Sequence, residues 1–162
     1  MADIKFRLGW GRQDQQLIAD ARQFWRDMDV MSPEDIEARV KQLCALAYAD
    51  GKVAAVSTVH LYDFPRLRSR FAYYRTIVSP DFRKQNLASR LCVYSRDELA
   101  QWARENPEEK IKGLFIILEA EEFRHRQHVP IGTQLDLKLV LVGYTPSGYQ
   151  MRVVWFDDAT VE

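Results

Sequence analysis

A short run in the middle of the chain combines residue types and spacing that could bind phosphate. It reads Val-Ser-Pro-Asp-Phe-Arg-Lys-Gln-Asn-Leu-Ala-Ser over residues 78–89. The apolar and aromatic residues at 71–78 are typical of a β-strand. After the run, one face of a predicted helix is marked by residues that recur at intervals of four and three: Ala88, Cys92, Ser95, Leu99 and Trp102. The run is therefore predicted to form the turn between a strand and a helix.

Such a turn concentrates hydrogen-bond donors and positive charge. The first N–H groups of a helix have no acceptor within the helix, and the helix dipole adds partial positive charge there. Phosphate oxygens bind well at this kind of helix terminus. Arg83 and Lys84 stand in the turn itself. The run therefore predicts an anion site made by backbone N–H groups of residues 84–89; the alternative is that the two cations are simply solvated.

The run resembles motif A of the GNAT superfamily, the acyl-CoA-dependent N-acyltransferases. In that motif Val-x-Pro is followed, three residues on, by Arg or Gln, and then by x-x-Gly-x-Gly/Ala at the helix start. Val78, Pro80, Arg83 and Ala88 match in type and spacing. Asn86 departs from the pattern, because it stands where the family has its first glycine. Asparagine tolerates a positive φ better than most other residues, so we expect the turn to form with it.

The resemblance implies a cofactor and a set of residues that bind it. The expected co-substrate is acetyl-CoA or another acyl-CoA, and no metal is expected. The turn and the helix start would hold the pyrophosphate, and the backbone of the preceding strand would hold the pantetheine arm. Carried over residue by residue, the cofactor-binding positions are Ile77, Val78, Arg83, Lys84, Gln85, Asn86, Leu87, Ala88 and Ser89.

The resemblance specifies the catalytic groups less well. Acyl transfer to an amine requires that the amine lose a proton, and protonation of the leaving thiolate assists it. Many family members use a Glu on the strand before motif A as the base, but this chain has Ala72 at that position. Many also use a Tyr on the helix after the fifth strand as the acid, but residues 120–127 contain no Tyr. The remaining candidates are Glu119 and Tyr74, which we predict as catalytic, together with His125 and His128.

Two other clusters are open to more than one interpretation. The Arg-rich loop predicted at residues 63–70 carries Arg66, Arg68 and Arg70, which could meet an acidic substrate or the 3′-phosphate of CoA, or could be solvated. His125 and His128 lie three residues apart, but no nearby Cys or further His completes a set of zinc ligands. No metal site is therefore predicted.

The rest of the chain supplies the elements that must position the turn. Helices are predicted at 13–27, at 33–43 after a Ser32 cap, from residue 88 to a stop at Asn106-Pro107, and at 120–127. Strands are predicted at 5–8, 44–48, 53–62, 71–78, 113–118, 135–144 and 149–156, with a hairpin turn at Asp50-Gly51. This order is that of the GNAT fold. The expected fold class is α/β (α+β), a single domain over residues 1–162 with a mixed, mostly antiparallel central sheet flanked by helices.

Composition restricts the class of protein. The 162 residues are 47% hydrophobic and 28% charged with zero net charge, which is ordinary globular usage and argues against a general nucleic-acid binder. No apolar run is long enough to span a membrane, and the first residues lack the apolar core of a signal peptide, so a cytoplasmic protein is expected. In that compartment Cys44 and Cys92 are expected to be reduced core residues.

These observations predict an N-acyltransferase that moves an acetyl group from acetyl-CoA to an amine by direct attack. The alternative is a non-catalytic acyl-CoA-binding or regulatory module of the same fold, which the missing Glu and Tyr favour. A nucleic-acid-binding module is a third reading, disfavoured by the zero net charge. The expected partners are the CoA thioester and an amine acceptor, with no membrane. The identity of the amine and the oligomeric state, a homodimer included, stay open.

Overall fold

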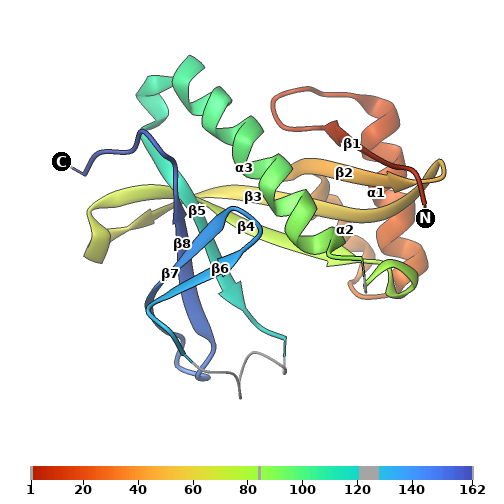
Figure 1. Ribbon diagram of the computed structural model, residues 1–162. Coiled ribbons are helices and arrows are strands. Elements are labelled where there is room, and N and C mark those ends of the chain that lie inside the picture. The colour runs from red at the N-terminus through yellow and green to blue at the C-terminus, as the bar shows by residue number, and fades with distance from the viewer. Residues whose placement is uncertain (1, 84, 121–127, 162) are drawn as a thin grey trace. The chain divides into compact units, whose positions relative to one another are not determined.

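The computed structural model describes residues 2–83, 85–120 and 128–161 (Figure 1). The helices in this part of the chain are α1 (Gln15–Met28), α2 (Pro33–Val40) and α3 (Leu87–Glu105), with short 3₁₀ turns η1 (Pro65–Leu67), η2 (Pro80–Phe82) and η3 (Pro107–Glu109). The strands are β1 (Ile4–Leu8), β2 (Leu43–Ala49), β3 (Lys52–Phe64), β4 (Ser69–Val78), β5 (Ile111–Leu118), β6 (Ile131–Gln134), β7 (Leu137–Tyr144) and β8 (Gln150–Trp155).

The described strands form one mixed sheet in the order β1-β2-β3-β4-β5-β8-β7-β6. The pairs β1/β2, β2/β3, β5/β8, β7/β8 and β6/β7 are antiparallel, and β4/β5 is parallel. The β4/β5 pair is parallel because α3 lies between these strands in the chain. The helix returns the chain to the end of the sheet where β4 begins, so β5 runs in the same direction as β4. The predicted fold class, an α/β protein with a mostly antiparallel sheet, is confirmed.

The chain divides into two compact units. The first comprises Met1–Val59 and Thr76–Leu99, and the second comprises His60–Arg75 and Ala100–Glu162. Strands β3 and β4 and helix α3 contribute residues to both units. The expectation of a single domain over the whole chain stays a prediction.

The first unit is built around an apolar cluster under α1 and α2. Helix α1 is capped by Asp14, whose carboxylate accepts hydrogen bonds from the N–H groups of Gln16 (3.0 Å) and Leu17 (3.2 Å). Its buried face then packs with α2 and with strands β2 and β3 in a core of Leu17, Ala21, Phe24, Trp25, Ile36, Leu43, Leu46 and Val56.

Helix α2 begins as the sequence predicted and ends earlier. The Ser32 hydroxyl caps it by accepting from the Asp35 N–H (3.1 Å), and Pro33 occupies its first turn. The helix ends at Val40 and not at residue 43. The physical reason is the sheet: the Gln42 carbonyl accepts from the Val59 N–H (2.8 Å), and Leu43 is already paired with Thr58 on β3.

The second unit has an aromatic core, which changes the segment predicted as an Arg-rich loop. Phe64 is buried against Phe71 and Phe115, with ring centroids 6.3 and 5.3 Å apart. Burial of Phe64 extends β3 to that residue, and β4 begins at Ser69, so only η1 and Arg68 lie between them. The prediction of a loop over residues 63–70 is therefore wrong in its length, because the segment between the two strands covers only residues 65–68.

The end of the chain contains one strand that the sequence did not reveal. Strand β6 pairs with β7 from Ile131↔Val140 to Gln134↔Leu137. Most of its side chains are exposed, so it lacks the alternation of apolar and polar residues that marks a half-buried strand. The helix predicted at 120–127 lies outside the described residues, apart from Ala120.

A buried guanidinium holds the last strands of the second unit together. Arg152 on β8 is 3% exposed and donates hydrogen bonds to the backbone carbonyls of Val129 (2.7 Å) and Leu139 (2.9 Å). It also donates to the side-chain oxygen of Gln150 (3.0 Å from Nε and 2.6 Å from Nη2). Among the described residues no carboxylate forms an ion pair with it, and burial lowers the pKa of Arg152 from its usual range.

We expect Arg152→Leu to lower the free energy of unfolding by about 2–4 kcal/mol, because partly buried carbonyls and the buried Gln150 amide lose their donor. The matched control is Arg104→Leu, which removes an exposed arginine 3.9 Å from Asp158 and should change stability by less than about 0.5 kcal/mol. Urea unfolding of both variants checks this. Equal losses in the two variants would contradict a structural role for Arg152.

Candidate functional site

The strand, turn and helix expected around residues 78–89 are all present in the first unit. Strand β4 ends at Val78, η2 spans Pro80–Phe82, and α3 starts at Leu87. The Ser79 N–H donates to the Ala54 carbonyl on β3 (2.8 Å), and the Thr76 hydroxyl donates to the Val56 carbonyl (3.2 Å). Leu87 is buried, so both ends of the turn are held by the first unit.

Asn86 has a backbone conformation that glycine adopts most readily. Its φ is +53°, in the left-handed region. Its carbonyl accepts the α3 hydrogen bond from the Arg90 N–H (2.9 Å). The N–H groups of Leu87, Ala88 and Ser89 therefore precede that bond and belong to the helix start, where an anion can use them.

The side chains around this helix start leave it open to a ligand. Arg83, Gln85, Asn86 and Ala88 are exposed, and Ser89 is partly buried. The Arg83 Nε–H donates weakly to the Val78 carbonyl (3.4 Å), which keeps the guanidinium beside the end of β4. Lys84 lies outside the described residues. The described cofactor-binding positions thus occupy one continuous segment of the first unit.

The two predicted catalytic residues both belong to the second unit. The parallel pairing of β4 with β5 covers Arg70↔Ile111, Ala72↔Leu114 and Tyr73↔Phe115. Tyr74 is the next residue on β4 and is only 3% exposed, whereas Glu119 follows the end of β5 and is exposed. Tyr74 therefore lies one residue beyond the paired stretch of β4 and β5, and Glu119 lies four residues beyond it.

The remaining positions at which the sequence suggested a catalytic group are Ala72, His125 and His128, and their surroundings differ. Ala72 is fully buried within the paired stretch and offers no ionisable group. His125 lies outside the described residues. His128 is exposed, and its Nδ1 is 2.8 Å from the Tyr144 hydroxyl. Sequence reasoning did not connect His128 with Tyr144, because they are 16 residues apart and share no element.

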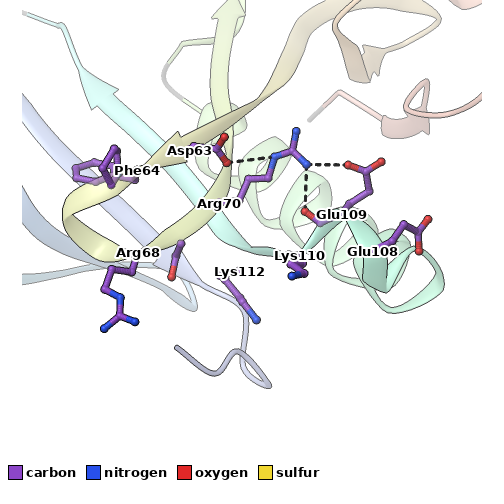
Figure 2. Close-up of a pocket in the computed structure, with 10 residues that line it drawn as sticks. Asp63, Phe64, Arg68, Arg70, Glu108, Glu109, Lys110 and Lys112 are labelled. Atoms are coloured by element: carbon purple, nitrogen blue, oxygen red, sulfur yellow. Dashed lines mark hydrogen bonds and ion pairs between the residues drawn. The ribbon is translucent and has the colours of Figure 1, made fainter. Parts of the chain in front are cut away.

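Part of the Arg-rich segment lines a pocket of about 520 Å³ in the second unit (Figure 2). Arg70 points between two acids: its Nη1 is 3.0 Å from the Glu109 carboxylate, and its Nε is 3.5 Å from Asp63. The positive charge of Arg70 is thus balanced by two carboxylates of the protein itself. Arg68 also lines the pocket, while Tyr74, Glu119 and the described residues of the turn (78–83 and 85–89) do not.

Several other functions find no support in the part of the chain that is described. Within residues 2–83, 85–120 and 128–161, no group of three or more His, Cys, Asp or Glu side chains could hold a metal ion. None of the described helices is long and apolar enough to cross a membrane. Cys44 and Cys92 are buried free thiols, and burial raises the pKa of each to about 12, so neither supplies a thiolate at neutral pH.

Comparison with known proteins identifies the fold. No protein-family model and no curated protein matches this sequence. The structure of a GNAT-family acetyltransferase from Streptococcus pneumoniae matches 95% of this chain and 100% of its own chain, with a TM-score of 0.55 and 13% sequence identity. RimL, an alpha-N-protein acetyltransferase of ribosomal L7/L12, matches 96% of this chain and 93% of its own at TM-score 0.52 and 13% identity.

A third structure points the same way. The loading GNATL domain of CurA from Lyngbya majuscula matches 94% of this chain and 98% of its own, with a TM-score of 0.51 and 13% identity. The chain therefore has the fold of the GNAT acetyltransferases, as its resemblance to motif A implied.

The conformation of Asn86 generates a stability prediction. Asn86→Val should lower the free energy of unfolding by about 1–2 kcal/mol, because a β-branched residue resists a positive φ. Asn86→Gly should be neutral or slightly stabilising. Thermal unfolding of the two variants measures the difference, and a valine variant as stable as the glycine variant would mean that residue 86 does not need the left-handed conformation.

Proposed function

We propose that this protein is an N-acyltransferase that transfers the acetyl group of acetyl-CoA to an amine by direct attack. One observation carries the proposal: Asn86, at φ +53°, immediately precedes α3 in the turn that follows β4 and η2, in a chain with the GNAT fold. This arrangement presents backbone donors at the position where the resemblance expects the pyrophosphate.

In this proposal the first unit binds the cofactor. The N–H groups from Gln85 to Ser89 and the Ser89 hydroxyl would donate to the pyrophosphate. Arg83, which is exposed, and Lys84 would add positive charge. The backbone of Ile77 and Val78 would hydrogen-bond the pantetheine arm. The exposed Ala88 supports close approach of the phosphates, because its side chain is a single methyl group.

The chemistry then needs no covalent enzyme intermediate. The amine nitrogen attacks the thioester carbon, the C–N bond forms, the C–S bond breaks, the amine loses a proton and the thiolate gains one. The high pKa of both buried thiols supports direct attack over transfer through a cysteine. Glu119 and Tyr74 would assist proton transfer, with ordered water carrying the amine proton to bulk solvent.

Acetyl-CoA should bind to the full chain, and binding should weaken as salt is added, because charge-assisted hydrogen bonds to phosphate are screened. Arg83→Glu should weaken binding by about 1–3 kcal/mol, the scale of a lost charged hydrogen bond. Lys52→Glu makes a like change of charge on an exposed residue of the β2–β3 hairpin and should leave binding unchanged. Isothermal titration calorimetry compares the three proteins.

Absence of heat and of thermal stabilisation at millimolar acetyl-CoA would contradict both the transferase and the non-catalytic acyl-CoA-binding module. Binding without release of free thiol in the presence of primary amines would favour the non-catalytic module.

Glu119→Gln and Tyr74→Phe should each leave measurable turnover. Positioning of the two reactants supplies much of the rate, with effective molarities of about 10⁵ M or more, whereas loss of a general base costs only about 10²–10⁴-fold. Activity should rise with pH as more of the amine becomes neutral. Thiol release followed across pH checks both statements.

Complete loss of turnover in Glu119→Gln with intact acetyl-CoA binding would instead identify Glu119 as an indispensable base. A rate that stays flat across the pKa of the amine would also contradict the proposal.

A further inference from the structure

The pocket of about 520 Å³ in the second unit has none of the roles proposed above (Figure 2). It lies where β4 and β5 begin, since Arg70 there pairs with Ile111, whereas Glu119 follows the far end of β5. The strand from Lys112 to Leu118 spans about 20 Å at the usual rise per residue. The pocket is therefore separate from the predicted catalytic Glu119, and its volume is in the range of about 300–1,000 Å³ that small-molecule sites occupy.

The charged side chains that line this pocket carry more positive than negative charge. Two of the acids, Asp63 and Glu109, are already paired with Arg70. Three further cations line the pocket: Arg68, Lys110 and Lys112. Within residues 2–83, 85–120 and 128–161, no carboxylate forms an ion pair with any of these three. The one other acid of the lining is Glu108, which in Figure 2 lies beyond Lys110 from Arg68 and Lys112. The pocket therefore offers its positive charge to an anion.

Two of these cations stand at positions where the backbone disfavours them. Six described residues other than glycine have a positive φ, and three of the six are Asp or Asn, which tolerate it. Arg68 (φ +49°) and Lys110 (φ +57°) are not of that kind, and each ends a 3₁₀ turn, a place where glycine or asparagine is usual. Long side chains in the left-handed region cost conformational energy, and such residues cluster at ligand-binding sites. Their presence together in one pocket indicates a role that needs their charge.

Arg70 fixes the geometry of the pocket. Its Nη1 donates to the Glu109 carboxylate (3.0 Å) and to the Glu109 backbone carbonyl (3.3 Å), directly before Lys110. Because Asp63 on β3 pairs with the same guanidinium, three segments that line the pocket meet at one side chain. Ser69 lines the pocket as well, and its hydroxyl is buried with no hydrogen-bond partner among the described residues. A buried polar group of this kind is rare, and a ligand oxygen would satisfy it.

We propose that this pocket binds a small oxyanion that carries at least two negative charges, in the form of phosphate or carboxylate groups. Arg68, Lys110 and Lys112 donate to its oxygens, because guanidinium and ammonium groups form strong, charge-assisted hydrogen bonds to such groups. The Arg70 ion pairs hold the surrounding segments in place. This site is distinct from the turn at residues 78–89, and it does not rest on the proposed acyl transfer.

Isothermal titration calorimetry of the full chain with pyrophosphate and with citrate tests the site for each kind of anionic group. At least one of the two should bind, and its binding should weaken as salt is added. Lys112→Ala should raise its dissociation constant by about tenfold or more, the scale of one lost charged hydrogen bond. The matched control is Lys138→Ala, which removes an exposed lysine from β7 outside the pocket and should leave the dissociation constant unchanged.

The left-handed positions allow binding to be separated from folding. Arg68→Gly and Lys110→Gly each remove a cation and supply the residue that a positive φ favours. Each variant should raise the dissociation constant by about tenfold or more. Its thermal unfolding midpoint, measured without the anion, should stay equal to that of the wild type or rise. A lower midpoint with unchanged binding would show that both residues serve the fold alone, and would overturn the proposal.

The remaining outcomes separate this pocket from the turn at residues 78–89. Absence of heat with both anions at millimolar concentration overturns the proposal. If Arg83→Glu weakens their binding and Lys112→Ala does not, the anions bind at the turn, which also overturns it. If Lys112→Ala weakens acetyl-CoA as much as pyrophosphate, the pocket belongs to the cofactor site and is not a separate one. The titrations with pyrophosphate and citrate need no acetyl-CoA, so failure of the proposed function is read independently of them.

Discussion

The proposed cofactor site depends on a single backbone constraint, the left-handed conformation of residue 86. With φ at +53°, Asn86 turns the chain sharply enough for α3 to begin at Leu87, and its own carbonyl starts the helical hydrogen bonds. The donors at the helix start then belong to a turn that the Ser79 hydrogen bond and the buried Leu87 anchor.

Burial and local partners separate the surroundings of three arginines of the chain. Arg83 is exposed with one weak contact to a carbonyl, so its charge is available to a ligand. Arg70 is matched by Asp63 and Glu109, so its charge is already used within the protein. Arg152 is buried among carbonyls and an amide, where it organises backbone. In the proposed function Arg83 would contact the ligand, whereas Arg70 is neutralised by carboxylates of the protein and Arg152 organises the backbone of the last strands.

Much of the fold could be predicted because its signals are local. The Ser32 cap, the turn at Asp50-Gly51 with φ of +49° and +81°, and the stop after Glu105 each follow from residues within a few positions of one another. Strand β6 and the true extent of β3 could not be predicted in this way. Their formation depends on pairing with β7 and on burial of Phe64 against Phe115, which are distant in sequence.

The sequence by itself determined the strand–turn–helix at residues 78–89, because capping, φ preference and helical spacing act between neighbours. It also determined the buried, unreactive state expected of Cys44 and Cys92, since both fall on apolar faces. Only the tertiary structure decided that His128 meets Tyr144 and that Arg152 holds the intervening backbone. Those contacts join segments whose separation is set by sheet register, and register is fixed by packing of the whole sheet, which no short stretch of sequence encodes.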